Sequence, residues 1–249
     1  MINKSLTVLA AAATLVAASN ANAYAIFTGA DGNNNPNVPL SSMPNATAAE
    51  TAFKSHLTGV GTETFEGRSG AAPLPLSFGA AGTATLQGGG MVSSAISGTT
   101  NGGRYSVGGG SNYWEVEATQ SGGFQVIFSQ DIAAFGFYGT DIGDFGGTLS
   151  LQFLNDSNVV ISTVVVPTAA ANVADGSALY FGAIAANNNE LFKSVRFVST
   201  LGTGDVFGFD NLTIGAKEQV TSVPEPTTLA LLSLGVLGFA AARRKSAKK

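Results

Sequence analysis

The sequence predicts a mainly β protein, an antiparallel two-layer β-sandwich of jelly-roll-like type with one short helix near its N-terminus. From Gly61 onward, about ten short runs of β-branched and aromatic residues alternate with polar residues, and glycine-rich turns separate them at a spacing of roughly 8–16 residues. Such spacing is typical of sandwiches and barrels. Only one stretch after the N-terminal apolar run and before residue 219 has helical periodicity. The β-sandwich is expected over residues 61–218.

The predicted helix lies within residues 44–60 and follows an irregular arm. Residues 24–43 are rich in Asn, Gly and Pro, so we expect little helix or strand there. Thr47 and Glu50 have the spacing of a capping box, and Phe53 and Leu57 lie four residues apart on one helix face.

Two details of the predicted strands can be tested directly. The apolar strands 113–119 and 124–129 are separated by the residues QSGG, which predicts a β-hairpin with Trp114 facing the core. Near the end of the sandwich, Phe207 and Phe209 occupy odd positions whereas Leu212 and Ile214 occupy even ones. Such a switch of the inward face requires a bulge or bend, which we expect near 210–211.

The N-terminus has the features of a secretory signal peptide. Lys4 precedes an apolar run over 6–18, and the small residues Ala21-Asn22-Ala23 follow. We expect export and cleavage by signal peptidase after Ala23. An N-terminal membrane anchor is the alternative, but the apolar run is short for a span.

Charge and composition exclude several classes of function. Between residues 24 and 222 there are six Lys and Arg against fifteen Asp and Glu, a formal charge of −9. Such a surface repels nucleic acid, so no nucleic-acid partner is expected. The chain has no cysteine and one histidine, His56, which argues against thiol catalysis and zinc sites. His56 is expected to be a partly exposed helix residue.

Carboxylates are the remaining candidates for catalysis. Glycoside hydrolysis needs two carboxyl groups on opposite sides of a cleft. Glu115 and Glu117 lie side by side on one strand face, and Glu63 and Glu66 point to opposite faces. No catalytic residues are therefore predicted.

Acidic residues within glycine-rich loops are candidate calcium ligands. Asp141 and Asp144 lie in GTDIGDFGG, and Asp205 and Asp210 lie in GTGDVFGFDN. Calcium prefers carboxylate and carbonyl oxygens from flexible loops. However, Asp side chains also bond their own backbone in turns, and this is the interpretation we favour here. We therefore expect no cofactor, with Ca²⁺ as the alternative.

A sugar-binding surface would need exposed aromatic rings. Tyr113 and Tyr138 are the candidate platform residues, because their neighbours in the strands are expected to face inward. The glycine-rich stretch 98–112 lacks the GK[ST] ending of a phosphate-binding loop.

The C-terminal region 219–249 reads as a linker, a Pro-Glu-Pro motif, a transmembrane helix and a basic tail. The residues 223–226 read VPEP, where the prolines interrupt regular structure. Residues 227–242 are apolar, and the basic cluster after them belongs on the cytoplasmic side. The domain is then expected on the far side of the inner membrane, held there by this helix.

This ending resembles the PEP-CTERM sorting signal of Gram-negative bacteria, which is also labelled an ice-binding-protein C-terminal domain. The resemblance implies that exosortase, a membrane-embedded protease, recognises and cleaves the tail, and that the protein reaches the cell surface or a biofilm and exopolysaccharide matrix. The residues that carry it are Val223, Pro224, Glu225, Pro226, Arg243, Arg244 and Lys245.

The middle of the chain is similar to the jelly-roll-like ectodomains of other PEP-CTERM proteins, whose function is unknown, through AFGFYGTDIGDFGG and GDVFGFDNLTIG. Three functions are considered. The first is an exported, non-enzymatic matrix or surface protein that is transiently anchored. The second is a carbohydrate-binding module, with or without stabilising calcium. The third is a carboxylate-dependent glycan hydrolase or lyase.

Overall fold

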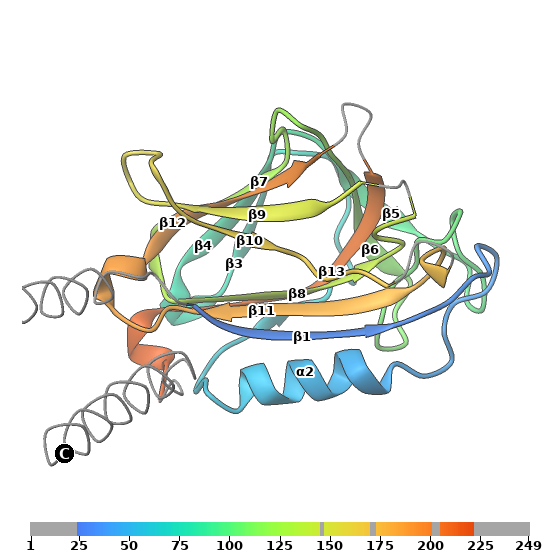
Figure 1. Ribbon diagram of the computed structural model, residues 1–249, viewed down its shortest axis with the longest axis horizontal. Helices are drawn as coiled ribbons and strands as arrows, with labels where there is room; N and C mark the ends of the chain where they lie inside the picture. Colours follow the sequence, from blue (N-terminus) through green and yellow to red (C-terminus); the bar gives the residue numbers. More distant parts are fainter. Residues whose placement is uncertain (1–23, 145–146, 170–172, 201–204, 222–249) are drawn as a thin grey trace, which may run out of the picture.

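A computed structural model describes residues 24–144, 147–169, 173–200 and 205–221. Two antiparallel sheets face one another, and helix α2 covers the outer side of one of them (Figure 1). The predicted mainly β sandwich with one short α-helix is confirmed for these residues.

The first sheet has seven strands in the order β1-β11-β8-β13-β6-β5, and β2 also pairs with β13. All its pairs are antiparallel. Its strands are β1 (Ala25–Asp31), β2 (Thr62–Glu63), β5 (Met91–Ser94), β6 (Asn112–Ala118), β8 (Ala134–Thr140), β11 (Ala178–Ile184) and β13 (Asp205–Gly215).

The second sheet has six strands in the order β10-β9-β12-β7-β4-β3. Short 3₁₀ helices lie in the connections, among them Gly79–Ala81, Asn188–Glu190 and Lys217–Gln219. The strands are β3 (Leu74–Ser77), β4 (Thr83–Gln87), β7 (Gln125–Ile132), β9 (Leu149–Leu154), β10 (Val160–Val165) and β12 (Phe192–Ser199).

The main core lies between the two sheets and is rich in phenylalanine. Phe137 and Phe209 stack with ring centroids 4.9 Å apart, and Phe197 of the opposite sheet meets Phe137 edge-on at 5.4 Å. Trp114 is fully buried in the same cluster, as its strand alternation predicts. Aromatic pairs add roughly 0.5–1.5 kcal/mol each beyond the area they bury, so this ring cluster joins the sheets firmly.

The predicted bulge in the last strand is present. The pairing of β13 with β8 shifts register between Asp210 and Thr213, and Asn211 adopts a positive φ of 49°. The bulge lets Phe209 and Leu212 both face the core. A single extra residue thus accounts for the change of parity seen in the sequence.

The predicted hairpin over residues 113–129 is wrong. β6 belongs to the seven-stranded sheet and β7 to the six-stranded sheet, so the QSGG segment carries the chain from one sheet to the other. The turn is tight, with the Gly122 amide donating to the Thr119 carbonyl at 3.1 Å. A turn sequence specifies only the local backbone conformation. The apolar faces of the two strands can be buried in the same core whether the strands pair with each other or belong to opposite sheets.

The prediction of an irregular arm over residues 24–43 is only partly correct. Its first third forms the edge strand β1, which pairs with β11. Helix α2 (Pro44–Lys54) lies within the predicted range 44–60 but has a different cap. The amide of Ala46 donates to the Asp31 carboxylate at 2.9 Å, so a distant strand end caps the helix. The predicted capping box of Thr47 and Glu50 is therefore wrong, and Glu50 pairs with Lys54.

Two strand glycines allow α2 to approach the sheet. Phe53 is fully buried on the helix side. A Cβ at Gly182 would lie 2.7 Å from the Phe53 ring, and one at Gly136 would lie 2.9 Å from it. Both distances are too short for a real Cβ atom. The absence of side chains at these glycines, in the adjacent strands β8 and β11, leaves room for the Phe53 ring.

After β13, the chain to Thr221 returns to the segment that follows helix α2. The Thr221 amide donates to the His56 carbonyl at 2.9 Å, and Val220 bridges Leu57. Both sheets, the helix and both hydrophobic clusters that the structure describes lie within residues 24–221. The predicted signal peptide and C-terminal membrane helix lie outside the described residues. Within the described part, no helix has the length and apolarity to span a membrane.

Candidate functional site

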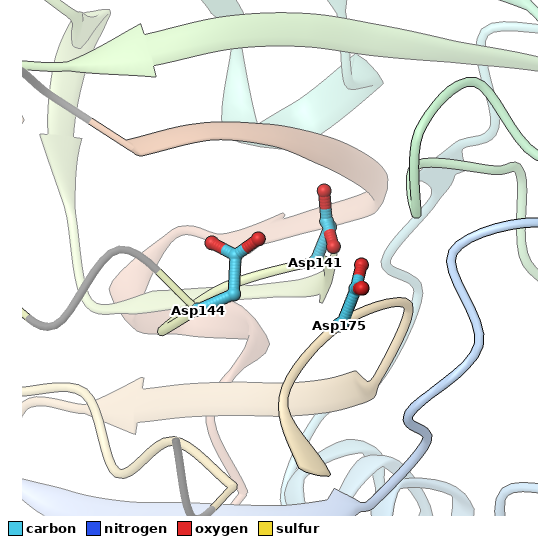
Figure 2. A group of neighbouring side chains, drawn as sticks. All are labelled: Asp141, Asp144 and Asp175. Atoms are coloured by element: carbon cyan, nitrogen blue, oxygen red, sulfur yellow. The ribbon is translucent and has the colours of Figure 1, made fainter. Parts of the chain in front are cut away.

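An acidic cluster lies where β8 ends and β11 begins. One carboxylate oxygen from each of Asp141, Asp144 and Asp175 lies within 4.8 Å of the other two. β8 and β11 are antiparallel neighbours with Thr140 opposite Ala178, so the loop after one meets the turn before the other. Figure 2 shows the three carboxylates rising from these two segments. Sheet topology thus brings together residues that are far apart in sequence.

Asp141 is the buried member of the cluster and is held by its backbone and side chain. Its φ is 67°, and its amide donates to the Ser177 carbonyl at 2.9 Å. Its Oδ1 accepts from the Gly176 amide at 2.8 Å. Gly103 packs so closely that an added Cβ there would overlap the Asp141 carboxylate. The carboxylate is therefore fixed in one position.

The electrostatic surroundings of Asp141 disfavour its charge. The pKa of Asp141 is raised to about 7, mainly by burial and in smaller part by the negative charges of Asp144 and Asp175. The hydrogen bond from Gly176 and the positive charge of Arg104 act in the opposite direction but only in part. Near neutral pH the cluster thus carries more negative charge than its protein partners neutralise.

Arg104 links this cluster to a second carboxylate. Its Nη1 lies 3.4 Å from Asp141 Oδ2, and its Nε donates to Glu115 Oε2 at 3.0 Å. The Tyr113 hydroxyl also donates to Glu115 Oε2, at 3.3 Å. The Arg104 guanidinium therefore forms ion pairs with two carboxylates. Glu115 takes part in this network and is not merely a solvated residue on a strand face, as its sequence position suggests.

The cluster has the chemistry of a site for a hard cation. Three carboxylates offer several oxygens, and glycine-rich loops can supply carbonyl oxygens as well. Asp144 is exposed and Asp175 is half-buried, so an ion can reach both side chains from solvent. Each carboxylate oxygen of Asp141 already faces a donor within the protein.

The other predicted ligands lie elsewhere or are not described. Asp210 is buried and accepts from the Val107 amide and the Ser106 hydroxyl, both at 2.9 Å. It thereby anchors the glycine-rich loop 98–111 to β13 and does not join the acidic cluster. The side chain of Asp205 lies outside the described part.

The predicted exposure of Tyr113 and Tyr138 is wrong. Tyr113 is fully buried and Tyr138 is 3 % exposed, because the glycine-rich loop and helix α2 belong to the layer that covers the outer sheet face. The Tyr138 hydroxyl donates to Glu50 at 2.9 Å, and burial raises its pKa. Neither ring can act as an open platform in this conformation.

Sequence reasoning missed Asp175, the third member of the cluster. Asp175 and Gly176 form a turn directly before an apolar strand, a position that usually suggests only turn chemistry. Pairing the strands AFGFYGT and ALYFGAI in antiparallel register would have placed this turn beside Asp141. The missing information was therefore the strand pairing.

Comparisons with known proteins identify the tail. Residues 222–245 match the PEP-CTERM protein-sorting motif, which includes every sorting residue named from the sequence. No curated protein matches the chain. A crystal structure of a DUF4465 family protein from Bacteroides ovatus is similar at 12 % identity and a TM-score of 0.28, covering 77 % of this chain and 98 % of that one.

The chain thus carries a PEP-CTERM sorting motif behind a β-sandwich domain. The motif indicates an exported protein with a transient membrane anchor, processed by exosortase and consistent with a place at the cell surface.

Proposed function

We propose that this chain is a non-catalytic β-sandwich protein of a Gram-negative bacterium that exosortase delivers to the cell surface or to an extracellular polysaccharide matrix. The observation that carries the proposal is the position of the sorting motif. The last strand of the sandwich, β13, ends at Gly215, and the motif begins at residue 222. Cleavage near Pro224-Glu225-Pro226 would therefore release the domain with its core intact.

The contacts of the acidic residues support a non-catalytic domain. Glu63 accepts from the Phe65 amide and from Arg68, and Glu66 accepts from the backbone amides of Ser111 and Asn112. These carboxylates hold a loop and a strand end in place. A hydrolase would instead use a pair that faces a substrate across a cleft.

The acidic cluster supports a second component of the proposal, namely bound Ca²⁺ with a structural role. An ion at Asp141, Asp144 and Asp175 would offset the repulsion among three carboxylates and would tie the loop after β8 to the turn before β11. Its expected effect is on stability, because binding to the folded state alone raises the free energy of unfolding.

Carbohydrate binding is the alternative to a purely structural role in the matrix. The burial of Tyr113 and Tyr138 removes the aromatic platform on which that interpretation depended. A glycan array with residues 24–221 separates the two, since selective retention of a glycan would favour the binding module.

The sorting proposal is tested in the producing cell with Pro224, Glu225 and Pro226 all replaced by alanine. Residues 24–221 should fold as before, but the full-length chain should accumulate in the membrane fraction and disappear from the matrix. Replacement of the adjacent Thr227 and Thr228 by alanine is the matched control and should leave processing unchanged. Normal processing and location of the first variant would contradict the proposal.

A further inference from the structure

Strand β10 is an open edge of the six-stranded sheet. It pairs with β9 on one side, with Val164 opposite Leu151 and Val165 opposite Ser150. The Val166 amide donates to the Leu149 carbonyl at 2.9 Å, which places Val166 and, by alternation, Val164 at hydrogen-bonded positions. Thr163 and Val165 therefore direct their backbone amides and carbonyls away from β9, and no described residue pairs with β10 on that side.

The other sheet edges are protected in ways that β10 is not. β3 contains Pro75, which has no amide to offer. β5 is flanked by residues 70–72, where the Ala72 amide donates to Gly90 and the Val92 amide donates to Gly70. On β1, the Ala30 carbonyl accepts from the Asn45 side chain, and α2 packs alongside. Natural proteins block edges in this manner because open edges pair with other chains.

The composition of β10 also lacks the usual protection. The sequence has no charged residue between Asp156 and Asp175. Val159, Val160 and Val165 are 56 %, 41 % and 56 % exposed, which is unusual for valines in and beside an edge strand. Edge strands that remain monomeric commonly carry lysine, proline, an inward-pointing charge or a β-bulge. Of these β10 has only a register shift between Val160 and Ser162, which leaves Ser162 to Val165 in regular pairing with β9.

We propose that β10 pairs antiparallel with β10 of a second copy of this chain, so that the two six-stranded sheets become one continuous sheet. In the symmetric register, Thr163 of each copy lies opposite Val165 of the other. Both outward-facing residues are then used, and β-branched side chains meet across the two-fold axis. This assembly does not depend on the proposed function.

Among the faces of two copies, charge favours this neutral edge as the place of contact, and the self-complementarity of its β-branched residues favours a second copy as the occupant. The region from residue 24 to 222 has a formal charge of −9, so most faces of two copies repel each other. The stretch around β10 is uncharged, and identical valine-rich strands are compatible with each other at every position. A basic partner would gain no attraction from this neutral edge.

The test compares residues 24–221 with the variant Val165→Lys by sedimentation equilibrium at several protein concentrations. Two lysines would lie at the shared strand pair, so the association constant should fall at least tenfold. Thr28→Lys on the exposed part of β1 is the matched control. It changes the net charge equally, and its association should equal that of the unsubstituted protein. Thermal melting confirms that all three proteins are folded.

Hydrogen exchange provides a second readout that a general loss of solubility would not reproduce. The amides of Thr163 and Val165 should exchange more slowly as protein concentration rises, whereas the Thr28 amide should not change. A monomer at all accessible concentrations, association that survives Val165→Lys, or equal loss in both lysine variants would overturn the proposal.

Discussion

Two buried aspartates at neighbouring strands show how differently the same residue can be used. Asp141 after β8 and Asp210 in β13 are 2 % and 1 % exposed, and burial raises the pKa of each to about 7. Asp210 accepts three hydrogen bonds, from Ser106, Val107 and Asn211. Asp141 accepts fewer and faces two further carboxylates.

Because the two aspartates are equally buried but have different partners, burial alone does not identify a binding site. The carboxylate of Asp210 is satisfied by the protein, and its task is to anchor a glycine-rich loop. Asp141 belongs to a group of three carboxylates whose negative charge exceeds what Arg104 can neutralise. A bound cation would reduce the repulsion within this group.

Replacement of Asp210 by alanine should produce the largest loss of stability. The Val107 amide and the Ser106 hydroxyl would lose their acceptor, and leaving such buried groups unsatisfied costs about 1–3 kcal/mol each. Urea unfolding should show a decrease of about 2–4 kcal/mol in the free energy of unfolding. A loss below about 0.5 kcal/mol would mean that the loop anchor is unimportant.

Replacement of Arg104 by methionine should cost about 2 kcal/mol, because Asp141 and Glu115 would remain as largely buried acids without their shared partner. Arg68→Met is the matched control, since its pair with Glu63 is more exposed and should contribute about 0–1 kcal/mol. Equal losses in the two variants, measured by urea unfolding, would contradict the special role of Arg104.

The pH dependence of stability follows from the two raised pKa values. An acid whose pKa is higher in the folded state than in the unfolded state binds protons more tightly when folded. Its stabilising contribution is present below about pH 4 and is lost as pH rises through about 7. Asp210→Asn should therefore reduce the fall in stability between pH 4 and pH 7.5. An unchanged pH profile in this variant would show that Asp210 titrates normally.

The smallest effect is expected for Asp144→Asn combined with Asp175→Asn. Without calcium, removing two like charges near Asp141 should stabilise the fold by about 0.5 kcal/mol. With millimolar Ca²⁺ at pH 7.5, the melting temperature of the unsubstituted protein should rise, whereas that of the double variant should not. A calcium-induced rise that persists in the double variant would place the ion elsewhere.

The sequence predicts the layers of this fold better than it predicts their connections. Alternation in β6 places Trp114 inside, and a change of parity places the bulge at Asp210 and Asn211, because both features are local. The crossing between β6 and β7, the helix cap by Asp31 and the participation of Asp175 all depend on contacts between distant segments. Periodicity carries no information about such pairings.

The burial of Tyr113 and Tyr138 has the same origin. Their strand positions face away from the core between the sheets, as alternation predicts. A second apolar layer, formed by α2 and the glycine-rich loop, then covers that outer face. A residue that points outward from a sheet is exposed only if nothing else packs on that sheet.

The most direct test of the proposed function is the intact mass of the protein recovered from the extracellular matrix of the producing bacterium. The recovered chain should begin near Tyr24 and end close to Pro224-Glu225-Pro226, without the basic tail. A matrix form that retains Arg243 to Lys249, or a protein that is confined to the cell interior, would contradict it.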